Sequence, residues 1–203
     1  MSILNREEDG MILHLKSLLV FTIIFLAACS QSNKISIPVE RKEHGFINYE
    51  TVEAEKAIQE MPFHFQLPES IPFQAGVEEG TIFESINDPF HKGITLRYFP
   101  KGSNVDLERK GPIIGPQEFL EYRVTNFEFN FGHIKKNEKF DKLVVEGREV
   151  YYSYSKEIPS VVVTWTEEGK EYFLSYVKSK SEYSTKELTM KNRIINVYKT
   201  LVD

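Results

Sequence analysis

The sequence predicts an α+β domain: a curved antiparallel sheet of about six strands, with an N-terminal helix and a C-terminal helix packed on it. Three observations support this prediction. Apolar and polar residues alternate with a period of two over several short segments between residues 81 and 177, which is typical of half-buried strands. Segments with a helical period flank these strands. The chain also holds 15 Phe, 10 Tyr and one Trp, residues that favour strands.

The first helix is expected over residues 51–61, with Thr51 as its N-cap and Pro62 as its end. Residues 63–73 follow as an extended connector, because Pro68 and Pro72 exclude a regular helix or a central strand. We expect this connector to pack three apolar side chains on the sheet: Phe65, Leu67 and Ile71.

The second helix is expected from about residue 185 to residue 201. Ser184 and Glu187 have the spacing of a capping box, and Lys199 complements the helix dipole. The stripe predicted to face the sheet recurs at steps of three and four residues: Leu188, Lys191, Ile194, Ile195, Tyr198 and Leu201.

Strands are expected at residues 81–86 and 94–99, and two hairpins follow later in the chain. Residues 142–145 and 149–154 flank a turn at Glu146-Gly147-Arg148, and residues 160–166 and 171–177 flank a turn at residues 167–170. Residues 119–131 are ambiguous, although alternation from Phe127 to Phe131 favours a strand. Residues 110–117 read as an irregular segment because of two Gly-Pro pairs.

Residues 11–30 have the layout of an export signal: Lys16, a short apolar run, and then Leu26-Ala27-Ala28-Cys29. This tetrapeptide resembles the bacterial lipobox, which implies cleavage between Ala28 and Cys29 and a diacylglyceryl group on Cys29. Cys29 is the only cysteine of the chain, so the domain forms no internal disulfide. Two acyl chains give stable membrane attachment, whereas one gives marginal binding. A single-span anchor or an ordinary secretory signal is the alternative.

The chain is therefore divided into a signal peptide (residues 1–28, with Met11 as an alternative start), a lipidated cysteine with a flexible tether (residues 29–48), and one domain (residues 49–203). The tether is expected mainly from residue 31 to about residue 45, which are polar and charged. Removal of residues 1–28 takes away two basic and three acidic side chains and leaves a net charge of −4. This mild acidity gives no electrostatic support for nucleic-acid binding.

No catalytic, cofactor or metal motif is found in the sequence. The histidines are at positions 14, 44, 64, 91 and 133, with no HExxH pair, and no G-x-S-x-G, P-loop or G-x-G-x-x-G is present. Two pairs of neighbouring carboxylates, Glu78-Glu79 and Glu167-Glu168, are expected in solvated turns. A glycosidase-like acid pair is an alternative that no other residue of the sequence supports.

The strongest candidate for a binding surface is an aromatic cluster on the predicted hairpins: Tyr151, Tyr152, Tyr154, Trp165, Tyr172 and Tyr176. On facing strands, alternate members share a face. They could form a platform for a sugar, a peptide or a lipid. The favoured alternative is that Tyr152, Tyr154 or Trp165 forms the core under the last helix.

From residue 55 to residue 201 the order of features resembles the domain-of-unknown-function-4367 family, found in lipoproteins and membrane-attached proteins of Gram-positive, spore-forming bacteria. The matching features are the Glu55-Lys56-Ala57 helix running into Pro62-Phe63, the Leu-Pro-Glu-Ser-Ile-Pro run at 67–72, the runs at 145–151 and 163–172, and the closing helix. Ile71-Pro72-Phe73 replaces the Gly-aromatic pair that usually follows the Leu-Pro element in this family. The resemblance implies a curved antiparallel sheet with helices, and no catalytic residues.

Together these features predict a lipid-anchored protein on the outer face of the cell membrane that acts as a non-enzymatic binding or sensing module. Its expected partners are the membrane, through the anchor, and a protein or an envelope polymer, with no cofactor. The alternatives are an envelope hydrolase that uses acidic residues and a purely structural lipoprotein.

Overall fold

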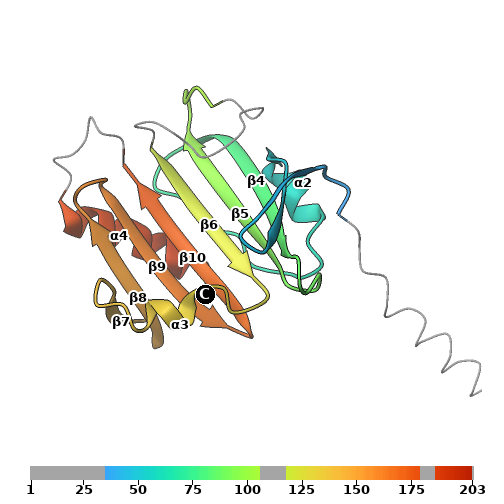
Figure 1. The fold of residues 1–203 in the computed structure, drawn as a ribbon. Coiled ribbons are helices and arrows are strands. Elements are labelled where there is room, and N and C mark those ends of the chain that lie inside the picture. Colours follow the sequence, from blue (N-terminus) through green and yellow to red (C-terminus); the bar gives the residue numbers. More distant parts are fainter. Residues whose placement is uncertain (1–34, 106–117, 179–185, 203) are drawn as a thin grey trace, which may run out of the picture. The chain divides into compact units, whose positions relative to one another are not determined.

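The computed structural model describes residues 35–105, 118–178 and 186–202, which form one ten-stranded antiparallel sheet with three helices (Figure 1). The strand order is β1-β2-β4-β5-β6-β10-β9-β8-β7, with β3 paired to β4, and the sheet is not closed. The strands are β1 (Val39–Glu43), β2 (Phe46–Tyr49), β3 (Val52–Glu53), β4 (Ala75–Ser85), β5 (Lys92–Pro100), β6 (Phe119–Thr125), β7 (Asp141–Val145), β8 (Arg148–Ser155), β9 (Ser160–Glu167) and β10 (Lys170–Val177). The helices are α2 (Ala54–Gln59), α3 (Phe131–Ile134) and α4 (Glu187–Lys199).

The α+β prediction is confirmed, but the count of about six strands is wrong. Most of the difference lies at the N-terminal edge, where residues 35–45 were expected within a flexible tether. Ile35 and Ile37 are instead buried, and β1 pairs with β2. The backbone N–H of Ser36 donates to Glu60 Oε2 at 3.0 Å, and the Ser36 hydroxyl donates to the other carboxylate oxygen. Since β1 is an edge strand with mostly exposed side chains, its sequence lacks the alternation that marks half-buried strands.

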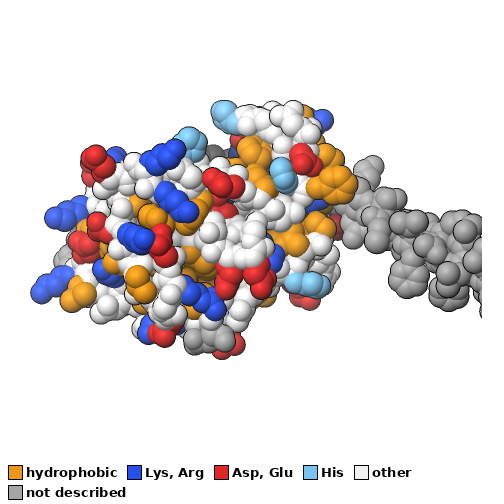
Figure 2. Space-filling view, turned by 90° about the horizontal axis from the view of Figure 1, so that it is seen from below, with side chains coloured by type: hydrophobic (Ala, Val, Ile, Leu, Met, Phe, Trp, Pro, Cys, Tyr) orange, Lys and Arg blue, Asp and Glu red, His pale blue; other side chains and the backbone are white. Residues whose placement is uncertain are grey.

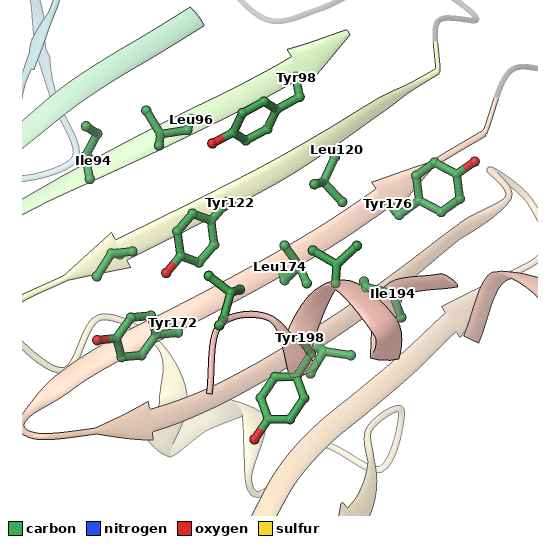
Figure 3. Close-up of a cluster of buried hydrophobic side chains, with 14 of the residues drawn as sticks. Ile94, Leu96, Tyr98, Leu120, Tyr122, Tyr172, Leu174, Tyr176, Ile194 and Tyr198 are labelled. Atoms are coloured by element: carbon green, nitrogen blue, oxygen red, sulfur yellow. The ribbon is translucent and has the colours of Figure 1, made fainter. Parts of the chain in front are cut away.

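One face of the sheet carries the main core. Alternate side chains of the central strands, together with α4, form a continuous buried cluster (Figure 3). It includes Ile94, Leu96 and Tyr98 from β5, Leu120 and Tyr122 from β6, Tyr172, Leu174 and Tyr176 from β10, and Ile194 and Tyr198 from α4. The predicted connector also lies against this core, with Phe65 and Ile71 packed on it, but Leu67 is 40% exposed. Its backbone is held there because the Tyr122 hydroxyl donates to the Gln66 carbonyl at 2.9 Å.

Helix α2 is shorter than predicted and begins at Ala54, after strand β3. Thr51 is not its N-cap: the Thr51 and Thr81 hydroxyls lie 3.1 Å apart and are hydrogen-bonded. The helix lies on β4 at Gly80, where an added Cβ would be 2.4 Å from the Ala57 Cβ. Glycine is therefore required at this position for close packing between the helix and the sheet.

Helix α4 lies across β9 and β10, as predicted. Its described residues begin after the predicted capping box, since Ser184 lies outside the described ranges. The predicted stripe is only partly correct: Ile194, Tyr198 and Leu201 are buried, whereas Leu188 is 66% exposed. Met190 and Val197 complete the buried surface.

Both predicted hairpins are confirmed. Their turns have positive φ at Glu146 and Gly147 and at Glu168 and Gly169, as two-residue turns between twisted strands require. The strand favoured over residues 127–131 is wrong, because β6 ends at Thr125 and α3 begins at Phe131. The segment predicted as irregular at 110–117 lies outside the described residues. Among the described helices, none is both long enough and apolar enough to cross a bilayer.

Candidate functional site

The second face of the sheet, opposite α2 and α4, carries polar side chains in rows across β4, β5 and β6. Antiparallel pairing places Glu79 beside Arg97, and Arg97 beside Glu121. The next row contains Thr81, Thr95 and Arg123, followed by Phe173 on β10. Register partners project from the same face of a sheet, so these rows form one surface, which we call the polar face.

A cleft of about 370 Å³ lies on the polar face, at the edge where the β1–β2 hairpin meets β4. We call it the hairpin cleft. Its walls combine charged groups, hydroxyls and aromatic rings from β1, β2, β4, β5 and β6 and the segment after β6. The lining residues are Glu40, Arg41, Glu43, His44, Phe46, Asn48, Thr51, Thr81, Phe83, Thr95, Arg97, Arg123 and Phe129.

One wall of the cleft is aromatic. The ring centroids of Phe46, Phe83 and Phe129 lie 5.4–5.8 Å apart in tilted and edge-to-face arrangements. Phe83 also covers Gly93, where an added Cβ would be 2.2 Å from the ring. The rings therefore fill the space beside the cleft and fix its shape.

Phe129 is held in place by a buried carboxylate. Glu171 is 3% exposed, and its Oε2 accepts backbone N–H groups from Phe129, Asn130 and Phe131 at 2.8, 2.8 and 3.0 Å. Hydrogen bonds to a charged acceptor are about twice as strong as neutral ones. Glu171 thus turns the chain away from the strand direction after β6 and directs the Phe129 ring toward the cleft.

Arg97 lies in the cleft floor, and two carboxylates compensate its charge. Its Nε donates to Glu121 at 2.7 Å, and its Nη1 lies 3.4 Å from Glu79 Oε1. Burial alone lowers the pKa of Arg97, but the two carboxylates outweigh burial and raise that pKa overall. Arg97 therefore fixes both carboxylates and offers little free charge to a ligand.

Arg123 is bound differently. Its guanidinium carbon lies 4.8 Å from the centroid of Phe129 and 4.5 Å from that of Phe173, so the group is enclosed by two rings. Among the described residues it makes no hydrogen bond and no ion pair. Burial lowers the pKa of Arg123, and the nearby charges of Glu121 and Glu171 oppose this only in part. Arg123 thus presents unused N–H donors to the cleft.

The aromatic cluster singled out from the sequence is mostly core. Tyr152, Trp165, Tyr172 and Tyr176 are at most 8% exposed. Trp165 stacks on Tyr172 at 5.0 Å and meets Tyr198 of α4 edge-to-face at 4.8 Å. The alternative that these rings form the core under the last helix is therefore the correct one for Tyr152 and Trp165.

The remaining two members of that cluster lie on opposite faces of β8. Tyr154 is partly buried against the core, whereas Tyr151 lies on the other side and packs edge-to-face on Phe131 at 5.4 Å. The structure therefore does not bring the six residues together as one exposed platform.

Other sequence candidates are dispersed. Glu78 and Glu79 project from opposite faces of β4, and Glu167 is paired with Arg148 while Glu168 occupies a turn. His91 stacks on Phe127, with ring centroids 4.9 Å apart. Within the described ranges no group of three or more His, Cys, Asp or Glu could hold a metal ion. Ala28 and Cys29, the predicted cleavage and lipidation site, lie outside the described residues.

The hairpin cleft was not predicted from the sequence. One local signal was present: Arg97 and Arg123 each stand between apolar neighbours in strands, which places them opposite the core. Their proximity depends on the register of β5 and β6. The cleft also depends on β1, a strand that the sequence did not predict.

The chain matches no family model, no curated protein and no solved structure at a significant level.

Proposed function

We propose that this protein is a lipid-anchored binding module on the outer face of the cell membrane. The proposed anchor is a diacylglyceryl group on Cys29, and the proposed binding site is the hairpin cleft. The expected ligand is a protein or an envelope polymer. We also propose that the chain belongs to the domain-of-unknown-function-4367 family, on the basis of the sequence runs at residues 67–72, 145–151 and 163–172.

The observation that carries this proposal is the composition of the cleft. Concave sites that combine aromatic walls with a few convergent polar groups are the usual form of ligand sites. Here the aromatic wall and the N–H donors of Arg123 line the same cleft, which has a volume of about 370 Å³. Figure 2 shows one face of the molecule, on which acidic and basic side chains are interspersed with hydrophobic side chains.

A hydrolase that uses acidic residues is less well supported. A general acid needs a raised carboxyl pKa. Among the described residues, the carboxyl pKa values that shift clearly are those of Glu60, Glu146 and Glu149, and all three are lowered by hydrogen bonds, from Ser36, Lys199 and Lys142 respectively. The two carboxylates behind the cleft lining, Glu79 and Glu121, are both bonded to Arg97.

The anchor is tested by Cys29→Ala. We expect this variant to lose incorporation of labelled palmitate and to accumulate as an unprocessed precursor or a released protein. Ser30→Ala, one residue further on, is the control and should be lipidated normally. Detection of Cys29→Ala at the processed size in the membrane fraction would refute the lipoprotein assignment.

Binding is tested with the full protein purified in detergent from membranes of its native host. Mass spectrometry of co-purifying material should identify a defined glycan or protein. Gly93→Phe, which forces the Phe83 ring out of its position, should lose this component while Cys29 remains lipidated. Recovery of nothing specific from the wild-type protein would favour the structural lipoprotein.

A further inference from the structure

We propose that the hairpin cleft recognises an oxyanion, a phosphate or carboxylate group, joined to an apolar or ring-shaped moiety, with Arg123 as its principal contact. This inference rests on the proposed binding function and names the ligand chemistry of the same site. It follows from three features of the cleft: the unused guanidinium of Arg123, the division of charge around the cleft, and a wall of hydroxyls and aromatic rings beside Arg123.

The first feature is the state of Arg123. A guanidinium carries five N–H donors in a rigid fork that matches two oxygens of a carboxylate or phosphate. The Phe129 and Phe173 rings enclose the cation and hold it in position, but rings accept no strong hydrogen bond. Because the described residues supply no acceptor for these donors, the fork is already placed for an oxyanion.

The second feature is how charge is divided around the cleft. Glu79 and Glu121 lie beside Arg97, and one oxygen of Glu171 binds three backbone N–H groups. None of these three carboxylates lines the cleft, whereas Arg97 and Arg123 do. On the rim, Glu43 is paired with Arg41 at 2.7 Å, and Glu40 lies 3.8 Å from the same guanidinium. Arg97 and Arg123 are therefore the charged groups that the floor exposes to the cleft, and of these two only Arg123 has no carboxylate partner among the described residues.

The third feature is the wall beside Arg123. Thr95 is the register partner of Arg123, and Thr81 is the register partner of Thr95, so two hydroxyls continue the polar row. Phe46, Phe83 and Phe129 also line the cleft. An isolated inorganic ion would leave this wall unused. A ring or short chain attached to the anion would contact it.

The test is a titration of the full protein with three related probes: phenyl phosphate, benzoate and the neutral benzyl alcohol. We expect saturable binding of at least one anion and at least about tenfold weaker binding of the alcohol, since a charged hydrogen bond is worth about one decade or more in affinity. Arg123→Gln should abolish this preference, and Arg123→Lys, which keeps the charge but loses the fork, should restore it in part.

Arg148→Gln is the matched control, because it removes the same charge from a residue outside the cleft. It should change anion affinity by less than about twofold. A second measurement does not depend on variants: the anion should slow modification of wild-type Arg123 by phenylglyoxal and leave Arg148 unaffected. Peptide mass spectrometry measures the modification of Arg123 and Arg148 in one sample.

The proposal is overturned if neither anion binds, if benzyl alcohol binds as tightly, or if Arg123→Gln retains the anion preference. Failure of the oxyanion proposal can be distinguished from failure of the proposed binding function. A protein that retains an envelope component equally well with Arg123→Gln would still be a binding module, with another ligand chemistry. Competition between phenyl phosphate and a purified envelope-polymer fraction shows whether the recognised group lies on a polymer.

Discussion

At the residue scale, Arg97 and Arg123 show that neighbouring cations of one sheet can have different roles. They stand in adjacent rows of the polar face, yet Arg97 bonds to two carboxylates while Arg123 is enclosed by two rings. Arg97 should therefore matter for stability and Arg123 for binding.

We predict that Arg97→Met destabilises the fold by about 2–4 kcal/mol at neutral pH. The side chains of Glu79 and Glu121 are only 1% and 19% exposed, and both lose the cation that they share. Urea unfolding at neutral pH measures this loss.

The control is Arg41→Met, which breaks an exposed pair with Glu43 on β1. Exposed pairs contribute about 1 kcal/mol or less. If Arg97→Met cost no more than Arg41→Met, the three-residue row would not stabilise the sheet in the way described.

At the scale of elements, the contact between α2 and β4 depends on the absence of a side chain at Gly80. We predict that Gly80→Ala destabilises the protein by about 1–3 kcal/mol, because its Cβ would overlap the Ala57 Cβ of the helix. Ala57→Gly should restore part of this loss in the double variant, although glycine inside a helix costs about 1 kcal/mol by itself. A double-mutant cycle from urea unfolding gives the coupling; additive losses would contradict the close contact.

Elements defined by local chemistry were predictable from the sequence. The β7–β8 and β9–β10 hairpins follow from alternation around Glu-Gly turns, and α4 from its helical period. Elements defined by distant contacts were not. Strand β1 forms by pairing with β2 although its sequence is polar, and Phe129 is directed by Glu171, some forty residues later in the chain. The hairpin cleft is formed by strands of both kinds, since predictable β4 and β5 meet unpredicted β1. Neither its position nor its charge could therefore be inferred from local patterns.

At the scale of the whole molecule, buried tyrosines should make the fold sensitive to alkali. Burial raises the pKa of Tyr172, Tyr176 and Tyr198 to about 12, from the ordinary value of about 10. Unfolded tyrosines then release protons that the folded protein still holds. We predict that stability is constant up to about pH 10 and falls between about pH 10 and pH 12. Urea midpoints across this range, with tyrosinate absorbance, measure the decline.

Tyr198→Phe is the informative variant, because the Tyr198 hydroxyl has no hydrogen-bond partner among the described residues. The variant should be at least as stable as the wild-type protein near neutral pH. Its stability should fall less steeply above about pH 10, since one ionising group has been removed. An unchanged slope would mean that Tyr198 does not ionise on unfolding in this range.

The burial of Ile35 limits where a lipid-anchored form could act. Five residues, 30–34, separate Cys29 from buried Ile35, and an extended chain spans roughly 3.5 Å per residue. With a lipid on Cys29, Ile35 therefore lies at most roughly 20 Å from the anchored residue. The domain would then sample only the zone next to the bilayer, so its occupancy would follow the local concentration of ligand at the membrane surface, however abundant that ligand were farther out.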